Sequence, residues 1–454
     1  MKIFTPVYIL LFLISFIFTE NIFPQNFQKN PMSDTLKTIT DLDKAITDSV
    51  KSNTDSAKVT VVKIDSLKKK TFTKKNTKSD TLFNKDDHPQ DITKGDGYYI
   101  YSKNGNSVLR IYGSIRAFGS YDFDGLSGGT SFAISNIPVG PGRNDQSTFF
   151  MTANITRFGF ESRRKFGFGN VFMKIETDFN GNNSTQFRIR HAFGQAVFLL
   201  AGQTWTVFSN VESIPNTVDL DGPPTAVTLR TVQLRFFKDF SKSLHFKASI
   251  EAPKVSFSAP DSVTIEQVNQ NFPDVALNLK KDFKNFEVSA ASVFKSIKVI
   301  EISGSVGALK GGGVFIGGKS LITKGLTLYF QALYGKGISS YLNISNNTAT
   351  DVVLNVQTGN YVLTTSYGGF AALSQKLFKG HLDLNVIYGQ INYDYEDYYP
   401  GSTFKSGQYF AFNAFYLTRA EFKLGIEYTY GFKRSMNNES GNANRTAFTF
   451  YYDF

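Results

Sequence analysis

The stretch that predicts the fold is FKLGIEYTY, residues 422–430. Apolar side chains stand at every second position from Phe422 to Tyr430, and Lys423, Gly425, Glu427 and Thr429 stand between them. A β-strand points successive side chains to opposite faces. This stretch is therefore expected to be a strand with one apolar and one polar face.

The same alternation recurs along the chain from Gly97 onward. In residues 109–117 the apolar Leu109 and Ile111 alternate with Arg110 and Tyr112, and in VFMKIETDF, residues 171–179, apolar positions alternate with Lys, Glu and Asp. A period of two that returns in many segments predicts a protein built from antiparallel strands.

Connections between these segments fall into two kinds. Short turns with Lys, Phe and Gly are expected at 163–170, 193–196, 238–243, 280–285, 319–325, 375–380 and 418–420. Longer polar connections are expected at 122–147, 180–184, 210–226, 253–272, 295–308, 336–360, 394–405 and 435–443. Their alternation gives about 16 strands.

Short turns at one end and long loops at the other are typical of an outer-membrane β-barrel, whose apolar face meets lipid. Arg188 and Arg190 share the polar face of one segment, and burying both in a dry core costs several kcal/mol each, whereas a water-filled lumen accepts them. The last residues, 446–454, put aromatic side chains on one face and end on Phe454, as such barrels typically do. The predicted fold class is an all-β transmembrane antiparallel barrel over residues 96–454.

Two segments precede this barrel. Residues 1–25 hold a Lys and then the apolar run VYILLFLISFIF, which is typical of a secretory signal peptide and short for a membrane span. Residues 26–95 are polar, with 14 Lys and Arg against 10 Asp and Glu, and are expected to be a periplasmic linker or a short coiled stalk.

Composition excludes several chemistries. The chain has no Cys, so disulfides and Cys-bound zinc are excluded, and its four scattered His favour no metal site. GVFIGGKS at 313–320 matches a phosphate-binding loop, but its residues are strand-like and more β character follows, so no nucleotide site is expected. The acidic loop at Asp394, Glu396 and Asp397 matches no calcium loop. We expect no enzyme, cofactor or nucleic-acid partner.

The polar face of the strands carries the functional signal, because the barrel region keeps about +7 of the chain's net charge of +11 once the linker's +4 is subtracted. A lumen with surplus guanidinium groups concentrates anions and can grip carboxylates. Alternatively, these cations pair with Glu161, Glu176, Asp178 and Glu251 and line a weakly selective pore. The basic residues expected to face the lumen are Arg110, Arg116, Arg157, Arg188, Arg190, Arg235, Lys247 and Lys280.

Two stretches resemble a known family. RIRHAFGQAVFLLAGQTWTVF at 188–208, followed by DLDGPP at 219–224, is similar to the DcaP-like branch of trimeric outer-membrane porins, and 156–179 resembles the early hairpin of that group. The resemblance implies a sixteen-stranded trimer in a gram-negative outer membrane, passing small anions such as dicarboxylates. It also implies a third external loop folded inward at 210–226, with Glu212, Asp219 and Asp221 as constriction acids facing Arg188, Arg190 and Arg235.

Two functions are consistent with the sequence. The first is a porin for passive diffusion of small hydrophilic solutes, favouring anions. The second is a non-conducting barrel that acts through its long loops as an adhesin or envelope anchor. Bilayer conductance discriminates between them.

Overall fold

The computed structural model describes residues 97–454 apart from 142–145, 182–185, 259–268, 301–303, 344–349, 396–398 and 419–421. The predicted signal peptide and linker, and the acidic residues Glu396 and Asp397, lie outside the described residues. Among the described residues, no helix is long and apolar enough to cross a membrane.

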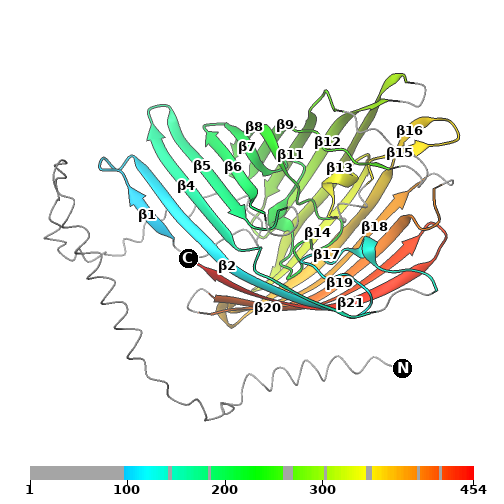
Figure 1. Ribbon diagram of the computed structural model, residues 1–454. Helices are drawn as coiled ribbons and strands as arrows, with labels where there is room; N and C mark the ends of the chain where they lie inside the picture. Colours follow the sequence, from blue (N-terminus) through cyan, green and yellow to red (C-terminus); the bar gives the residue numbers. More distant parts are fainter. Residues whose placement is uncertain are drawn as a thin grey trace, which may run out of the picture. The chain divides into compact units, whose positions relative to one another are not determined.

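An 18-stranded antiparallel sheet closes on itself to form the barrel (Figure 1). Two of its strands, β1 (Tyr98–Tyr101) and β3 (Thr148–Thr152), are short additions beside β2, so the wall has the 16 strands predicted from the sequence. The wall strands are β2 (Ser107–Asp122), β4 (Arg157–Phe166), β5 (Gly169–Asp178), β6 (Arg188–Ala196), β7 (Leu199–Trp205), β8 (Arg230–Ser241), β9 (Leu244–Glu251), β11 (Asp274–Asp282), β12 (Phe286–Ile300), β13 (Val306–Thr323), β14 (Leu326–Lys336), β17 (Thr365–Leu377), β18 (Leu382–Asp394), β19 (Phe404–Leu417), β20 (Phe422–Ser435) and β21 (Ser440–Asp453).

The first and last wall strands close the barrel. Ser114 to Asp122 of β2 pair with Asp453 to Arg445 of β21, and Ser107 to Ser114 pair with β4 on the other side. β1 pairs with β2 at the barrel end that carries the β4–β5 turn, on the side of β2 where β21 lies. β3 pairs with β2 at the opposite end, on the side of β2 where β4 lies. Closure leaves the wall strands without the unpaired edge that an open sheet would expose.

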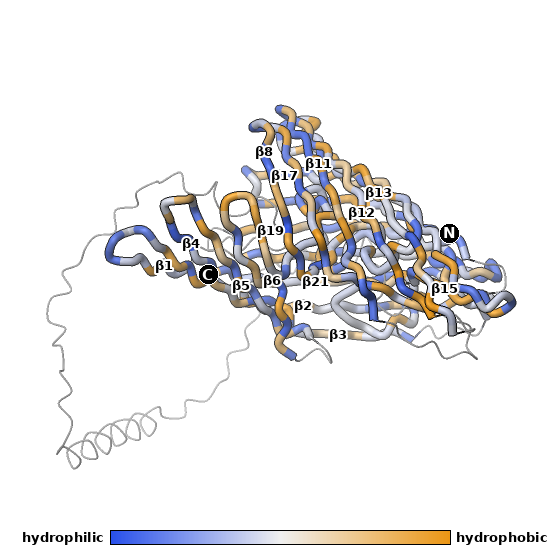
Figure 2. The backbone as a smooth tube through the Cα atoms, turned by 90° about the horizontal axis from the view of Figure 1, so that it is seen from above, coloured by the Kyte–Doolittle hydropathy of each residue, from blue (hydrophilic) through white to orange (hydrophobic). Residues whose placement is uncertain are grey.

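Side chains of opposite character face the two sides of the wall. In β2, Ile115 is half exposed while its neighbours Ser114 and Arg116 are buried. Tyr430 is exposed on β20, and Glu427 is buried there. Figure 2 shows hydrophobic and hydrophilic residues mixed closely along the strands. The apolar parity therefore lies outside, where a membrane barrel meets lipid, as the alternation predicted.

Seven short connections and eight longer ones join the wall strands, as predicted, but three boundaries were wrong. The turn expected at 193–196 lies at Val197 and Phe198, because β6 continues to Ala196. Strands β12 and β13 extend through most of the loop expected at 295–308. Likewise, β20 and β21 reduce the loop expected at 435–443 to 436–439. Long strands carry polar residues above the membrane, where polarity no longer marks a loop.

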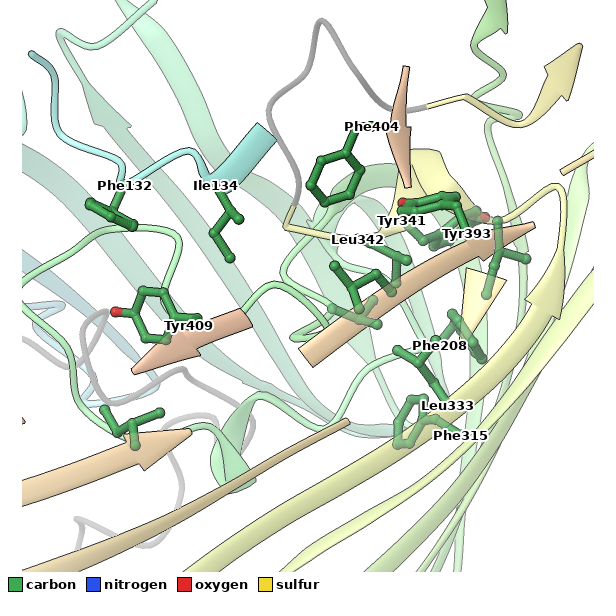
Figure 3. Packing of buried hydrophobic residues seen from close by; sticks show 14 of the residues in the cluster. Phe132, Ile134, Phe208, Phe315, Leu333, Tyr341, Leu342, Tyr393, Phe404 and Tyr409 are labelled. Atoms are coloured by element: carbon green, nitrogen blue, oxygen red, sulfur yellow. The ribbon is translucent and has the colours of Figure 1, made fainter. Parts of the chain in front are cut away.

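Three long loops fold into the barrel and pack together. They contribute Phe132, beside the 3-10 turn η1 (Ile134–Asn136), Phe208, and Tyr341 of η4 (Ser339–Tyr341). Phe208 packs on Phe315 of β13 with ring centroids 5.3 Å apart, and Phe132 packs on the ring of Tyr409 (Figure 3). The apolar core thus lies between inward loops and the inner wall. A further loop sheet of β10 (Phe257–Ser258), β15 (Val352–Asn355) and β16 (Asn360–Leu363) joins two of the long connections.

Candidate pore lining and constriction loop

The third long connection, residues 206–229, folds inward from the end of β7 and returns to β8. Its entry is held by Glu251 on β9, which accepts hydrogen bonds from the Thr206 hydroxyl at 2.6 Å and from the Val207 amide at 2.8 Å. Asn278 on β11 donates to the carbonyl oxygens of Val207 and Ser209 at 3.1 and 3.0 Å. Glu251, an expected partner for arginine, instead anchors this loop.

The middle of the loop is held by the far wall. Asn413 on β19 donates to the Asn216 carbonyl at 2.9 Å, and Gln331 on β14 donates to the Thr225 carbonyl at 2.6 Å. Glu427 on β20 accepts the backbone N–H groups of Val218 and Asp219. The loop therefore crosses the barrel interior, as the resemblance implied, and we call residues 206–229 the constriction loop.

Asp219 is fully buried at the tip of the constriction loop. Its carboxylate accepts the Phe132 amide at 2.9 Å and the Asp221 amide at 3.3 Å, joining the first inward loop to the third. Burial, with the nearby carboxylates of Asp221 and Glu427, raises the pKa of the Asp219 carboxyl to about 8. Burial also raises the pKa of Asp221. Asp219 thus lies within the contact between the first inward loop and the constriction loop.

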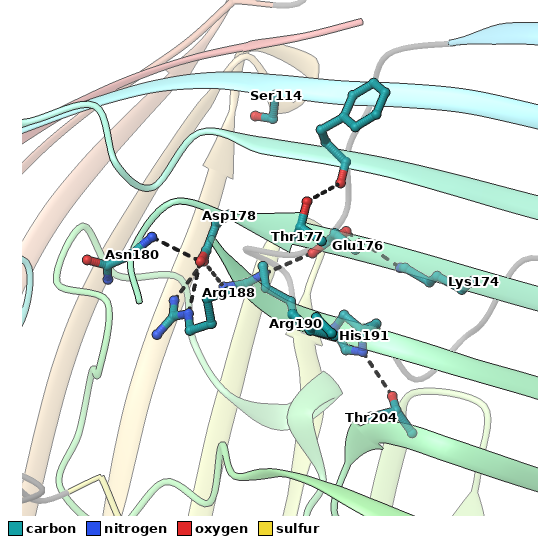
Figure 4. Close-up of polar contacts among 12 residues, drawn as sticks. Ser114, Lys174, Glu176, Thr177, Asp178, Asn180, Arg188, Arg190, His191 and Thr204 are labelled. Carbon is teal, nitrogen blue, oxygen red and sulfur yellow. Dashed lines mark hydrogen bonds and ion pairs between the residues drawn. The ribbon is translucent and has the colours of Figure 1, made fainter. Parts of the chain in front are cut away.

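Arg188 and Arg190 lie together on β6, beside two carboxylates of β5 (Figure 4). Arg188 grips Asp178 through two nitrogens at 2.9 and 2.6 Å. Arg190 is buried and reaches Glu176 at 2.9 Å and Asp178 at 3.0 Å. The Arg188 side chain remains 38% exposed, and it shares the inward parity of Arg190 on β6.

The charged pattern continues around the wall to β2 and β4. Arg110 pairs with Glu161 at 3.1 Å, and Lys174 lies 3.7 Å from Glu161 and 3.8 Å from Glu176. We call this set the charge ladder; with Arg157, which acts electrostatically on Glu176, it has five cations against three carboxylates. The charge-ladder residues are Arg110, Arg157, Glu161, Lys174, Glu176, Asp178, Arg188 and Arg190.

Arg116 lies outside this ladder. It is buried, donates to the Ser114 hydroxyl at 2.8 Å, and its guanidinium carbon lies 4.4 Å from the Tyr451 ring centroid. A cation stacked on a ring in the wall packs the closure of the barrel. Nothing in this contact set presents Arg116 to a passing solute.

A second group of the predicted residues meets on the opposite side of the constriction loop. Lys280 on β11 pairs with Glu212 of the short turn η3 (Val211–Ser213) at 2.8 Å and with Glu287 at 3.4 Å. Arg235 donates to the Trp205 carbonyl at 2.5 Å, and the three cations Arg235, Lys247 and Lys280 line a cavity of about 30 Å³ together with Glu212. Such a cavity has room for ordered water.

The predicted acids of the constriction loop and the predicted arginines of the wall therefore do not form two rows that face each other across the pore. Glu212 contacts Lys280 and Lys319, whereas Asp221 interacts with Arg188 and Asp219 is buried. Lys319 lies in β13, 3.2 Å from Glu287, and the whole GVFIGGKS stretch belongs to that strand. The expected strand character of this stretch is confirmed.

Sequence reasoning missed two buried ion pairs. Arg445 holds Asp122 through nitrogens at 2.6 and 2.9 Å, where β21 meets β2. Lys295 lies 3.5 Å from Asp351, and neither side chain is exposed. Both pairs join residues far apart in the chain, so only a search for matched charges on register-paired strands could have found the first.

Among the described residues, no group of three or more His, Asp or Glu side chains is arranged to hold a metal ion. A closed barrel of 16 strands, with an exposed apolar face, charged inner walls and an inward third loop, defines the class of outer-membrane porins.

Comparisons with known proteins agree. The crystal structure of the outer-membrane channel DcaP of Acinetobacter baumannii superposes with a TM-score of 0.69 at 22% identity, over 79% of this chain and 99% of that one. Salmonella typhi OmpF in complex with daunomycin gives 0.52 at 15% identity, over 79% and 100%. Vibrio cholerae OmpT gives 0.50 at 12% identity, over 79% and 100%. No curated protein sequence matches.

A family model described as DcaP outer membrane protein matches residues 42–300. The chain belongs to this family, which confirms the resemblance drawn from residues 188–224. It is a protein of the gram-negative outer membrane, built as a channel of the porin class.

Proposed function

We propose that the protein is a porin for passive diffusion of small hydrophilic solutes and that it favours anions such as dicarboxylates. The observation that carries this proposal is Arg188, whose side chain is 38% exposed although Asp178 holds it by two nitrogens. A positioned, water-accessible guanidinium can share a second carboxylate without first giving up its ion pair.

The surplus of cations in the charge ladder supports the same preference. Five cations stand against three carboxylates on the wall, or four with Asp221 of the constriction loop, which acts electrostatically on Arg188, and this leaves a positive excess. A low-dielectric wall focuses the field of this excess into the lumen. The ion pairs weaken this preference, because each carboxylate offsets a cation. We therefore expect a modest anion selectivity and a dicarboxylate preference set by Arg188 and its neighbours.

Reversal potentials in planar bilayers under a KCl gradient test the proposal. The parent protein should conduct, with its reversal potential displaced toward the chloride equilibrium potential. Arg188→Glu should move the reversal potential toward the potassium equilibrium potential. Arg190→Glu is a poorer test, because Arg190 is buried between two carboxylates and its loss disturbs the wall. Lys324→Glu, at an exposed turn, is the matched control and should leave the potential in place. A potential insensitive to Arg188→Glu would contradict the assignment.

Further features of the proposal follow from the class. We propose a homotrimer in outer-membrane lipid, an N-terminal extension in the periplasm, and no enzymatic activity or cofactor. We also propose that Arg157, Arg235, Lys247 and Lys280 line the pore. Glu212, which lies 2.8 Å from Lys280, is the proposed constriction acid.

One observation favours the alternative, a barrel that does not conduct. The inward loops pack an apolar cluster across the interior, in which Phe132, Phe208 and Tyr341 are all buried. A barrel filled in this way could present its long loops as an adhesive surface. Folded protein that leaves the bilayer insulating, and whose surface binding survives Arg188→Glu but not loop deletion, would favour this alternative.

A further inference from the structure

A basic residue followed two positions later by phenylalanine recurs at the end of the barrel that carries the short turns. It occurs as Arg164 and Phe166 before the β4–β5 turn, and as KDF at 238–240 and at 281–283. Residues two apart on a strand share a face. The phenylalanines are exposed, Phe166 by 40%, Phe240 by 62% and Phe283 by 56%.

Each pair lies on the membrane face of the wall. In β8 the exposed Leu234 and Phe236 share the parity of Lys238, while the buried Gln233 and Arg235 take the other parity. In β11 the exposed Val275 and Leu279 share the parity of Lys281. Lys238 and Lys281 therefore lie on the lipid-facing side of their strands, close to the turn.

The alternation separates the charges of the two KDF copies. Asp239 and Asp282 have the opposite parity and both contact His245, at 2.5 Å to Nδ1 and 3.2 Å to Nε2. The acidic side chains thus gather toward the lumen side of the rim around one imidazole. Lys238 and Lys281 are left on the outer side, and their charges are not offset on that face by these two carboxylates.

The two lysines flank one strand. Lys238 pairs in register with Phe246 of β9, and Lys281 pairs with Leu244 of the same strand. Strands lie about 4.8 Å apart and residues about 3.4 Å apart along a strand, so two strand spacings and a two-residue offset place the lysine Cα positions about 12 Å from one another. The Lys281 ammonium donates to the Ser243 hydroxyl at 2.9 Å and lies 5.8 Å from the Phe283 ring centroid.

We propose that Lys238, Lys281 and Ser243 bind the phosphate of an anionic phospholipid in the periplasm-facing leaflet. Short turns of such barrels lie on the periplasmic side, where aromatic girdles mark the membrane boundary. Two ammonium groups and a hydroxyl match a phosphate diester, and the rings of Phe240, Phe246 and Phe283 lie beside its glycerol and acyl chains. The outward parity selects a lipid over a soluble anion, because a phosphate arriving with acyl chains approaches from the membrane side.

Titration of the full-length chain in neutral detergent with phosphatidylglycerol, followed by native mass spectrometry, tests the proposal. Each lysine near an anionic headgroup contributes about a fivefold gain, so Lys238→Gln with Lys281→Gln should weaken binding roughly thirtyfold. The double arginine variant at the same positions should retain it. The glutamine variant should bind phosphatidylcholine as well as the parent protein does.

The matched control removes two charges from the same rim, at the exposed turn residues Lys324 and Lys379. Diffuse attraction would fall equally in both double variants, and that equality would overturn the site. Inorganic phosphate should not displace the lipid at millimolar concentration; displacement would identify a free-anion site instead. The heat-dependent gel mobility of each variant confirms that its barrel is folded, so loss of binding in a folded glutamine variant supports the proposal.

Discussion

Glu427 on β20 accepts the backbone amide of Asp219 at 2.9 Å, although 208 residues separate the two in the chain. The same carboxylate accepts the Val218 amide at 2.9 Å and the Asn413 side-chain amide at 2.8 Å. One wall residue therefore satisfies two donors at the tip of the constriction loop. A loop held this way needs no regular secondary structure to keep its position.

Glu427→Ala should release the tip of the constriction loop. Hydrogen bonds to a charged group contribute about 1.5–3 kcal/mol each, so losing two leaves both amides unsatisfied and the loop free to open locally. We expect amide hydrogen exchange at Val218 and Asp219 to accelerate at least about a hundredfold. Exchange in β12, which does not contact Glu427, serves as the internal control, and unchanged protection at Val218 would contradict the anchor.

The constriction loop should also loosen as the pH rises. Burial holds the pKa of Asp219 at about 8, against an ordinary value of 3.8 in the unfolded chain. The unfolded chain loses its proton first, so between about pH 4 and pH 8 the folded state binds more protons and its stability falls with rising pH. The stabilising contribution is complete below the unfolded value and is lost as the pH passes 8.

Asp219→Asn should reduce this dependence. The amide keeps the size of the carboxyl and remains uncharged beside Asp221, Glu427 and Tyr409, and near Arg445. Proteolysis within residues 206–229, measured from pH 6 to pH 9, should accelerate in the parent protein and accelerate less in the variant, in which Asp221 is the remaining loop carboxyl with a raised pKa. Equal acceleration in both proteins would mean that another group titrates.

The strand pattern could be predicted because it depends on local alternation. FKLGIEYTY at 422–430 identifies a strand and its two faces, and repetition of that pattern with alternating turn lengths gives the barrel. Boundaries at 295–308 and 435–443 were wrong, because β12, β13, β20 and β21 extend beyond the apolar band, where alternation gives no lipid-facing signal.

The site could be predicted only in part, because its partners come from remote strands. Parity placed Arg188 and Arg190 on the polar face, and Glu176 and Asp178 were considered as partners, as the structure has them. Parity did not indicate that Glu251 holds the constriction loop or that Lys280 meets Glu212. Such contacts depend on which wall residues an inward loop packs against, and no local sequence pattern predicts that.

Removing one partner of the Arg445–Asp122 pair should destabilise the barrel closure. Both side chains are buried, and Arg445 contacts Asp122 through two nitrogens. Breaking a buried pair leaves an uncompensated charge and costs about 3–5 kcal/mol. Asp122→Leu should therefore lower the urea midpoint of unfolding, followed by tryptophan fluorescence in detergent.

The double variant Asp122→Leu with Arg445→Met discriminates charge burial from lost packing. Two apolar side chains of similar volume remove both charges together, so most of the lost stability should return. A double variant as unstable as Asp122→Leu alone would show that packing at this junction decides the effect.

Phe132→Ala should widen the barrel interior on the side of the long loops. The Phe132 ring packs on Tyr409 at 6.2 Å between centroids and lies 5.5 Å from the guanidinium carbon of Arg445, and a Cβ added at Gly431 would meet it at 2.4 Å. Truncating a buried phenylalanine costs about 3–5 kcal/mol, enough to undock the first inward loop from the wall. Single-channel conductance should therefore rise.

Phe149→Ala is the matched control for that measurement. Phe149 is 60% exposed on β3, so the same atoms are removed without opening the interior cluster. Conductance should remain at the parent level in Phe149→Ala and increase only in Phe132→Ala. An increase in both would place the effect in the outer surface, whereas no increase in a folded Phe132→Ala protein would mean that solutes pass beside the first loop, along the charge ladder that includes Arg188 and Asp178.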